Sequence, residues 1–190
     1  MRYDPLDYDD ANEKVRNIYS DYLRSTHSFE LPNWLKSLGK SENLADGYWS
    51  FVKSTLVEGE LPSILKEMVL FLVSVTNGSP YCATAHAHAV MALDKGLTFE
   101  DLVAMAENID AVRMPEATKA ALKFSVKLIS SPHSLERDDF ATLSRLGFSD
   151  AQIQELIATA SLAQMFNTYA ISLGLPIEEG YRSFPLEQAA

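Results

Sequence analysis

The stretch Asn77-Gly-Ser-Pro-Tyr-Cys-Ala-Thr-Ala-His-Ala-His88 divides two predicted helices and contains the only cysteine of the chain. Asn-Gly is typical of a helix end. Ser-Pro starts a new helix, because serine is a favoured N-cap residue and proline is tolerated at the first helical position. Cys82 is then the third residue of the helix, where unpaired N–H groups and the helix dipole favour a thiolate. His86 follows one turn later on the same face, within reach of the thiol as a proton acceptor.

Simpler explanations exist for each of these residues. A single cysteine near a helix start is more often a small core residue than a catalytic one, and the N-cap role alone accounts for Ser79. His88 lies on a different face of the helix, and we expect it to serve packing or an oligomer contact. A metal ion would find only two ligands on one face of this helix, even with Glu67 nearby, so we predict neither a metal nor a cofactor.

Apolar side chains recur with the period of an α-helix along most of the chain. No segment alternates with the period of a strand, so the sequence predicts an all-α fold. The segment 62–76 is apolar nearly all round, which is typical of a buried central helix. We expect helices over 11–23 (capped by Asp9 or Asp10), 34–38, 41–57, 62–76, 80–95, 115–129, 135–146 and 150–173.

Two further features refine this helical plan. Gly96 and Gly147 each end a predicted helix and are followed by an apolar residue, a hydroxyl N-cap and then an acid or amide, which is the capping-box pattern. The similarity indicates either a shared way of turning between helices or an internal duplication. We expect Gly96 to form a left-handed helix cap. The expected core face of the helix over 41–57 consists of Leu44, Tyr48, Phe51, Val52 and Leu56.

Length and composition favour one domain. A chain of 190 residues with 47% hydrophobic content can bury a full core. We expect a single domain over 1–190, with an N-terminal helical extension at about 1–30 and a C-terminal tail at about 176–190. One cysteine excludes a disulfide within the chain, and no secretion leader is visible, so we expect a cytoplasmic location.

Charge and hydropathy argue against two classes of partner. Acidic residues outnumber basic ones by 26 to 16, which gives a net charge of −10, and no basic cluster offsets it. This charge repels phosphate backbones, so we predict no nucleic-acid partner. The longest apolar run, 68–73, is far shorter than the roughly 20 residues that cross a bilayer, so we predict no membrane span.

Glu67 and the cysteine stretch together resemble the motif of a known family. In the carboxymuconolactone decarboxylase and alkylhydroperoxidase D-like superfamily, a glutamate is followed after eleven residues by Cys-x-x-Cys-x-x-x-His. Glu67 and Ser79 have this spacing. Cys82 and His86 match the second cysteine and the histidine, so the departure from the motif is the serine at the first cysteine position.

The resemblance is to the peroxidase-related branch and covers about residues 30–180. It includes the Gly-Leu-Thr and Gly-Phe-Ser turns and a late helix with Phe166-Asn167 that leads to Leu-Gly-Leu-Pro at 173–176. It implies an alkylhydroperoxidase D-like helical bundle that forms homo-oligomers: dimers, trimers or hexamers. The active site would then lie between the glutamate helix and the cysteine helix.

The resemblance also implies roles for individual residues. In peroxidase-like members the second cysteine attacks the peroxide and becomes a sulfenic acid, and the first cysteine resolves it as a disulfide. Carried over, Cys82 would be the peroxidatic thiol, Glu67 and His86 would relay protons, and Ser79 would occupy the resolving position. A serine caps a helix well but cannot form a disulfide, so an oxidised Cys82 would need an external thiol. We therefore expect a one-cysteine or impaired hydroperoxide reductase, with a hydroperoxide and an external thiol reductant as its small-molecule partners.

Aromatic residues supply the candidates for a substrate pocket. Tyr81 occupies a position at which some members carry a relay histidine, and Tyr48 and Trp49 could line the same site. Aromatic residues in the N-terminal quarter are, however, more often part of the core or of an oligomer contact.

Two other classes of function remain open from the sequence. The decarboxylase branch suggests an acid–base enzyme that uses His86 and Glu67, and in that case Cys82→Ala would leave the activity intact. A non-catalytic relative that acts as a binding module would be inert towards peroxides and would hold a stable partner.

Overall fold

The computed structural model describes residues 4–186, and within these residues the regular structure is entirely helical. The predicted all-α fold is therefore confirmed, and the predicted helix spans agree with the observed ones to within a few residues. The helices are α1 (Glu13–Thr26), α2 (Asn33–Leu38), α3 (Glu42–Val52), α4 (Ser63–Thr76), α5 (Pro80–Leu93), α6 (Phe99–Glu107), α7 (Glu116–Ser130), α8 (Arg137–Arg145) and α9 (Asp150–Leu173). A π-helical turn, Lys53–Val57, extends α3, and 3-10 turns lie at Ile109–Ala111 and Pro132–Ser134.

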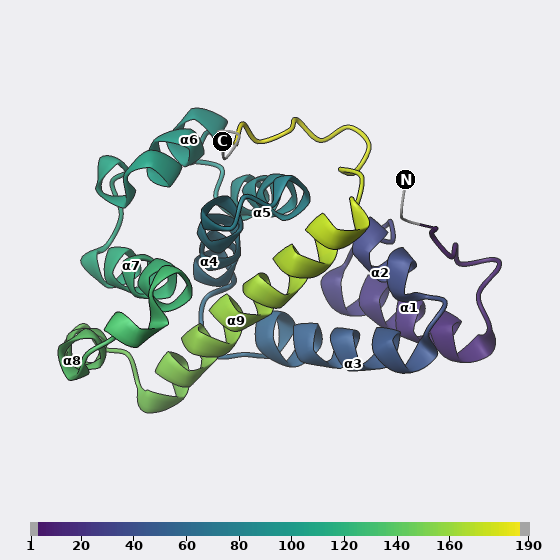
Figure 1. Ribbon diagram of the computed structural model, residues 1–190, viewed down its shortest axis with the longest axis horizontal. Helices are drawn as coiled ribbons and strands as arrows, with labels where there is room; N and C mark the ends of the chain where they lie inside the picture. The colour runs from purple at the N-terminus through teal and green to yellow at the C-terminus, as the bar shows by residue number, and fades with distance from the viewer. Residues whose placement is uncertain (1–3, 187–190) are drawn as a thin grey trace.

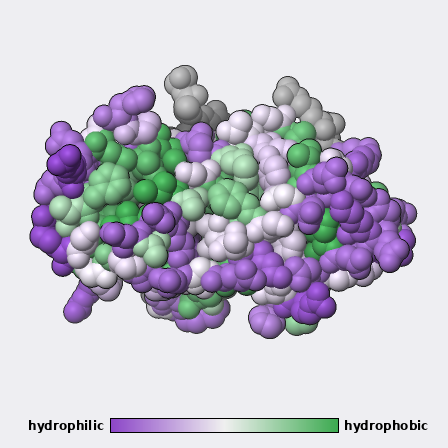
Figure 2. Space-filling model, turned by 90° about the horizontal axis from the view of Figure 1, so that it is seen from below, coloured by the Kyte–Doolittle hydropathy of each residue, from purple (hydrophilic) through white to green (hydrophobic). Residues whose placement is uncertain are grey.

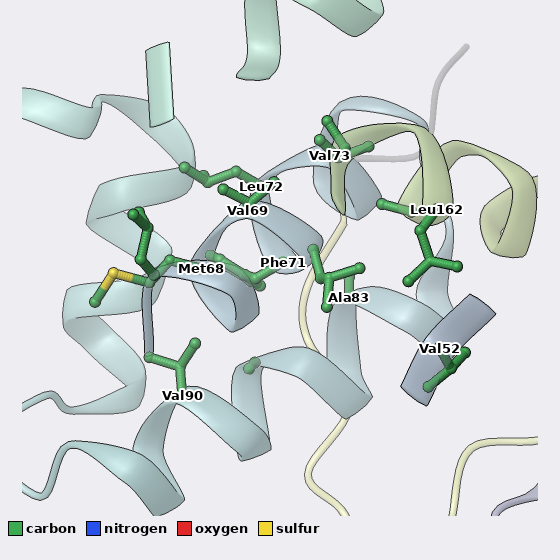
Figure 3. Packing of buried hydrophobic residues seen from close by; sticks show 14 of the residues in the cluster. Val52, Met68, Val69, Phe71, Leu72, Val73, Ala83, Val90 and Leu162 are labelled. Atoms are coloured by element: carbon green, nitrogen blue, oxygen red, sulfur yellow. The ribbon is translucent and has the colours of Figure 1, made fainter. Parts of the chain in front are cut away.

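The α4 helix lies at the centre and packs against α5, α7 and α9 (Figure 1). Its buried positions are Leu65, Lys66 and every residue of 68–74, which confirms the prediction of a central helix that is apolar nearly all round. Figure 3 shows Phe71 and Val73 of α4 in one apolar cluster with Val90 of α5 and Leu162 of α9. These contacts fix α4 against α5, the two helices that carry the predicted site.

The first three helices lie on the other side of α9 from α4–α8 (Figure 1). The predicted cap of α1 by Asp9 or Asp10 is wrong. Asn12 is the N-cap, and its side chain accepts the N–H of Val15 at 3.0 Å. Asn12 directly precedes α1, three residues before its first buried position, Val15, so it satisfies an N–H group that the earlier aspartates cannot reach.

The predicted core face of α3 is confirmed at Val52, and Tyr48 and Leu56 pack against the core, but the prediction is wrong at Leu44 and Phe51. The buried residues are Ala45, Trp49 and Val52, whereas Leu44 is 53% exposed and Phe51 is 37% exposed. Trp49 decides this orientation. Its ring packs on Tyr22 of α1 at 5.2 Å between centroids, and a bulky indole gains more from burial than a leucine at the opposite face.

The two glycine junctions differ from each other. Both predicted capping boxes are present, at Thr98 with Asp101 and at Ser149 with Gln152. Gly147 has a left-handed backbone with φ of 99°, but Gly96 does not, so the predicted left-handed cap at Gly96 is wrong. There the side chain of Asp94 accepts the N–H of Gly96 at 2.8 Å and makes the turn instead.

After α9, the chain returns across α5 towards α6 (Figure 1). Phe184 is buried between the rings of Phe71 and Phe99, at 4.9 and 5.6 Å. His88 stacks on Tyr181 at 4.2 Å, so its role is packing within the chain.

Residues 1–3 and 187–190, which belong to the predicted extension and tail, lie outside the described residues. Within 4–186 no helix is both long enough and apolar enough to cross a membrane.

Candidate active site

The start of α5 places Ser79 and Cys82 as predicted, but the serine hydroxyl does not cap the helix. Ser79 is the N-cap residue, and its N–H donates to the carbonyl of Ser74 at 2.9 Å. Its Oγ makes no capping bond and has no hydrogen-bond partner of ordinary geometry within 4–186. The side chain is fully buried. Buried hydroxyls are almost always hydrogen-bonded, so this unpaired hydroxyl near the thiol needs an explanation other than helix capping.

Cys82 is buried, with only 4% of its surface exposed. It lies in a small apolar cluster with Tyr81, Ala170 and Leu175, and the rings of Trp34 and Phe166 pack against this cluster. Burial raises the pKa of the thiol from 9.0 to about 11, and the nearby Ser79 hydroxyl lowers it only in part. The predicted shift towards a thiolate is therefore wrong for this conformation, because removing the sulfur from water outweighs the helix dipole.

Glu67 and His86 form the pair that the motif predicts. Glu67 Oε2 lies 2.7 Å from His86 Nδ1, and the two side chains are 20% and 22% exposed. A carboxylate can only accept, so Nδ1 donates this hydrogen bond and Nε2 is the ring nitrogen left for another partner. The central helix thus orients the imidazole of His86 on the face of α5 that also carries Cys82, one turn away.

The hydroxyl of Tyr81 links three segments of the chain through hydrogen bonds. Its hydroxyl donates to Glu178 Oε1 at 2.6 Å and accepts the N–H of Trp34 at 3.2 Å. Glu178 also accepts the N–H of Asn33 at 2.9 Å. Burial and the Glu178 carboxylate raise the pKa of Tyr81, so it stays a neutral donor. These bonds join α2, α5 and the segment after α9 beside the apolar cover of Cys82.

Two residues of this region were missed by sequence reasoning. Glu178 is a single acid in a segment without helical period, and only the return of the chain brings it to Tyr81. Tyr22 lies on α1. Its pKa is raised to about 12, mainly by burial, with smaller contributions from Glu67 and Glu178, so it lies near both acids. No local pattern signals either position.

The other two predicted pocket residues have different neighbours. Tyr48 packs on Phe166 at 5.4 Å, and Phe166 in turn contacts Trp34 at 4.9 Å. Tyr48 therefore supports the rings that cover Cys82. Trp49 is buried against α1, where its Nε1 donates to Asp21 at 2.8 Å. A role for either residue in substrate binding stays a prediction.

The best-formed cavities of the described chain lie elsewhere. A cavity of about 480 Å³ is lined by residues from the start of α4, the end of α5 and the turn between α8 and α9. Figure 2 shows apolar side chains gathered on the side of the molecule that holds α7 and α8. Cys82 lies at the start of α5 and does not line this cavity or three further open cavities of about 650, 270 and 350 Å³. A ligand therefore reaches the thiol only after its cover opens.

We expect alkylation to report the neutral state of Cys82 directly. Iodoacetamide should react slowly at pH 8 and progressively faster as the pH approaches about 11, because only the thiolate is nucleophilic. The native state holds the thiol proton more tightly than the unfolded chain, so the protein should lose stability as the pH rises from about 9 to about 11. The Cys82→Ala variant is the control, since it should lack this part of the loss. An alkylation rate that reaches its plateau below pH 9 would contradict the prediction.

Comparison with protein families finds a match over the part of the chain that carries these residues. Residues 42–126, which contain Glu67, Cys82 and His86, match the carboxymuconolactone decarboxylase family. No curated protein matches the sequence.

Solved structures share the fold across nearly the whole chain. A peroxidase-related protein with an alkylhydroperoxidase core from Ralstonia eutropha JMP134 is 20% identical, with a TM-score of 0.83 over 94% of this chain and 92% of its own. A peroxidase-related protein from Silicibacter sp. TM1040 is 20% identical, with a TM-score of 0.77 over 95% and 91%. The debrominase Bmp8 is 23% identical, with a TM-score of 0.76 over 92% and 91%. Residues 42–126 are therefore similar to the carboxymuconolactone decarboxylase family, and the chain as a whole has the alkylhydroperoxidase D-like fold.

Proposed function

We propose that this protein is a thiol-dependent hydroperoxide reductase that works with one cysteine. The observation that carries the proposal is the 2.7 Å hydrogen bond between Glu67 and His86, one helical turn from the only thiol of the chain. In its neutral form, an oriented imidazole one helical turn from a buried thiol supplies the base that general-base activation of a nucleophile needs. The likeness to peroxidase-related proteins supports the proposal at the level of the fold.

The proposed reaction begins with the transfer of the Cys82 proton to His86 Nε2. The thiolate then attacks the terminal oxygen of R–O–O–H, so that an S–O bond forms and the O–O bond breaks. The leaving alkoxide takes a proton from the imidazolium and departs as an alcohol. Cys82 is oxidised to a sulfenic acid, and the hydroperoxide is reduced.

The second half of the proposed cycle uses an external thiol. Ser79 cannot resolve the sulfenic acid, so one external thiol attacks the Cys82 sulfur, releases water and forms a mixed disulfide. A second external thiol exchanges with that disulfide and restores Cys82. The high pKa of the resting thiol suits this cycle, because an unreactive Cys82 is protected until substrate and base are both in place.

Brief exposure to one equivalent of tert-butyl hydroperoxide tests the proposal. We expect a sulfenic acid on Cys82, detected by mass spectrometry after trapping with dimedone. His86→Ala and Glu67→Gln should each slow its formation by about a hundredfold, the usual contribution of a positioned base and its orienting partner. His88→Ala, on the same helix but stacked on Tyr181, is the matched control and should leave the rate unchanged.

Other outcomes favour the alternatives. If wild-type Cys82 stays unmodified under excess peroxide, the proposal fails. An acid–base activity that survives Cys82→Ala would support a decarboxylase-like enzyme, and inertness together with a stable bound partner would support a binding module.

A cytoplasmic location and assembly into a homo-oligomer stay predictions. Exposed Leu44, Phe51 and Ile171 offer apolar surface for assembly.

A second candidate function follows from one relative and the rings around the thiol. A cysteine-to-alanine variant of the debrominase Bmp8 was crystallised with 2,3,4-tribromopyrrole. In this chain Trp34, Phe166 and Tyr81 surround Cys82 with aromatic surface, which suits a flat halogenated ring. Release of bromide from a brominated pyrrole in the presence of a dithiol, and its loss in Cys82→Ala, would support this activity.

A further inference from the structure

Two buried side chains near the thiol each carry a polar atom without a partner. Ser79 is fully buried and Asn167 is 1% exposed, and Ser79 Oγ and Asn167 Nδ2 have no hydrogen-bond partner of ordinary geometry within the described chain. No other buried side-chain polar atom of residues 4–186 is in this position. Buried polar groups are almost always paired, since leaving one unpaired is costly. Two such atoms, one at the start of α5 and one on α9, both linked to Ser74, point to a ligand.

The sequence spacing directs both atoms to the surroundings of Cys82. Ser79 precedes Cys82 by three residues at the start of α5, and Asn167 precedes Ala170 by three residues on α9. Residues three apart share a helix face, and Cys82 and Ala170 belong to one cluster. Ser74 links the two side chains. Its carbonyl accepts the N–H of Ser79, and its Oγ lies 2.9 Å from the Asn167 carboxamide.

The chemistry of Ser74 decides which end of the Asn167 amide is unpaired. Ser74 Oγ lies 2.6 Å from the carbonyl of Leu70 as well as 2.9 Å from the amide. Its hydroxyl has one proton, and the Leu70 carbonyl can only accept, so the proton belongs to that bond. The Asn167 NH₂ group must then donate to Ser74 Oγ. This exchanges the positions of the amide nitrogen and oxygen, which are assigned from the hydrogen-bond network. The unpaired atom of Asn167 is thus the acceptor Oδ1.

We propose that Ser79 and Asn167 bind the –O–O–H group of the hydroperoxide against Cys82. The terminal O–H of the peroxide donates to Asn167 Oδ1, which holds that oxygen for attack by the sulfur. The Ser79 hydroxyl donates to the inner oxygen, where negative charge develops as the O–O bond breaks. The inference rests on the proposed function and adds to it a binding site that the cysteine motif does not contain.

This arrangement gives the serine at position 79 a chemical use. A thiol is a weak hydrogen-bond donor, whereas a hydroxyl is a strong one. A chain that relies on an external thiol for the second half-reaction can use position 79 for the first half-reaction.

The experiment compares two reactions of the same thiol in the full chain. One is the second-order rate of Cys82 oxidation by tert-butyl hydroperoxide, and the other is alkylation by iodoacetamide, which needs no peroxide site. In Asn167→Leu the oxidation rate should fall by about tenfold or more, while the alkylation rate and its pH profile change less than about twofold. Ser79→Ala should also slow oxidation more than it slows alkylation.

Gln164→Ala is the matched control. It removes another amide hydrogen bond between α4 and α9, that of Asn77 to Gln164 at 2.9 Å, but touches neither unpaired atom. It should leave both rates unchanged. Asn167→Ala is the second variant in case Asn167→Leu does not fold, and thermal melting identifies the usable one.

The outcomes separate this inference from the proposed function. If the wild type is oxidised and the Asn167 variants are oxidised equally fast, the peroxide site is overturned and the reductase proposal stands. Oxidation and alkylation that slow in parallel would also overturn it, because Asn167 would then only support the surroundings of Cys82. A wild type that is not oxidised removes the reductase proposal and the peroxide site together.

Discussion

Replacing Glu155 with alanine is expected to lower the free energy of unfolding by about 3–5 kcal/mol, because it leaves the buried ammonium of Lys66 without its counter-charge. The side chain of Lys66 is 2% exposed and that of Glu155 is 11% exposed. Lys66 Nζ donates to Glu155 Oε1 at 3.1 Å and to the carbonyl of Thr55 at 3.0 Å. Only the carbonyl would remain as a partner.

The Glu155 carboxylate also holds the loop that leads into α4. It accepts the N–H of Glu60 at 2.7 Å and the N–H of Leu61 at 3.1 Å. A Cβ atom at Gly59 would collide with the same carboxylate, so this acid fills the space that the glycine leaves. Losing Glu155 therefore frees the start of α4, the helix that presents Glu67 one residue after Lys66.

Urea unfolding followed by circular dichroism measures this effect. Glu155→Gln should cost less than Glu155→Ala, because the amide oxygen can still accept the loop N–H groups. Asp138→Ala is the control for an exposed pair. Asp138 and Arg145 are 80% and 63% exposed, and the loss should be at most about 1 kcal/mol. Equal urea midpoints for Glu155→Ala and Asp138→Ala would contradict the prediction, because the buried pair would then contribute no more to stability than the exposed one.

The helical plan was predictable because its signals are local. Apolar period, Ser-Pro at a helix start and the capping boxes at Thr98 and Ser149 each act within a few residues, and each is present in the structure. The pairing of Glu67 with His86 was predictable for another reason. It came from a spacing characteristic of a family, and the hydrogen bond between the two residues agrees with it.

The failures come from interactions between distant segments. The α3 helix turned its Trp49 face inwards because Tyr22 and Asp21 of α1 receive that indole. The state of the thiol depends on rings from α2 and α9, which the stretch 77–88 cannot reveal. Helix position alone predicted a thiolate for Cys82, and burial by these distant residues reversed the direction of the pKa shift.

The Ser79→Cys variant is expected to change the fate of oxidised Cys82. The introduced thiol would lie three residues before Cys82 at a helix start, the spacing of a Cys-x-x-Cys motif. It should attack the sulfenic acid, release water and form a disulfide within the chain. Because the attack is intramolecular, the sulfenic acid should disappear on the order of a hundredfold faster than in the wild type with millimolar external thiol.

Mass spectrometry of the intact chain after one equivalent of peroxide measures this result. The variant should lose two hydrogens, whereas the wild type should gain one oxygen and then more under excess peroxide. Ser130→Cys, which adds a thiol on α7, is the control and should behave like the wild type. An oxidised Cys82 that persists in Ser79→Cys would mean that the two side chains do not face each other.

In the same variant, the sulfenic acid should be resolved faster, but Cys82 should be oxidised more slowly. Its thiol donates weakly, so the inner oxygen of the peroxide would lose the hydrogen bond that we assign to Ser79. Stopped-flow fluorescence of the tryptophans can follow the first oxidation separately from disulfide formation. Slower oxidation combined with faster resolution would mean that serine and cysteine at this position each favour one half of the cycle, and that the serine is suited to a chain that depends on external thiols.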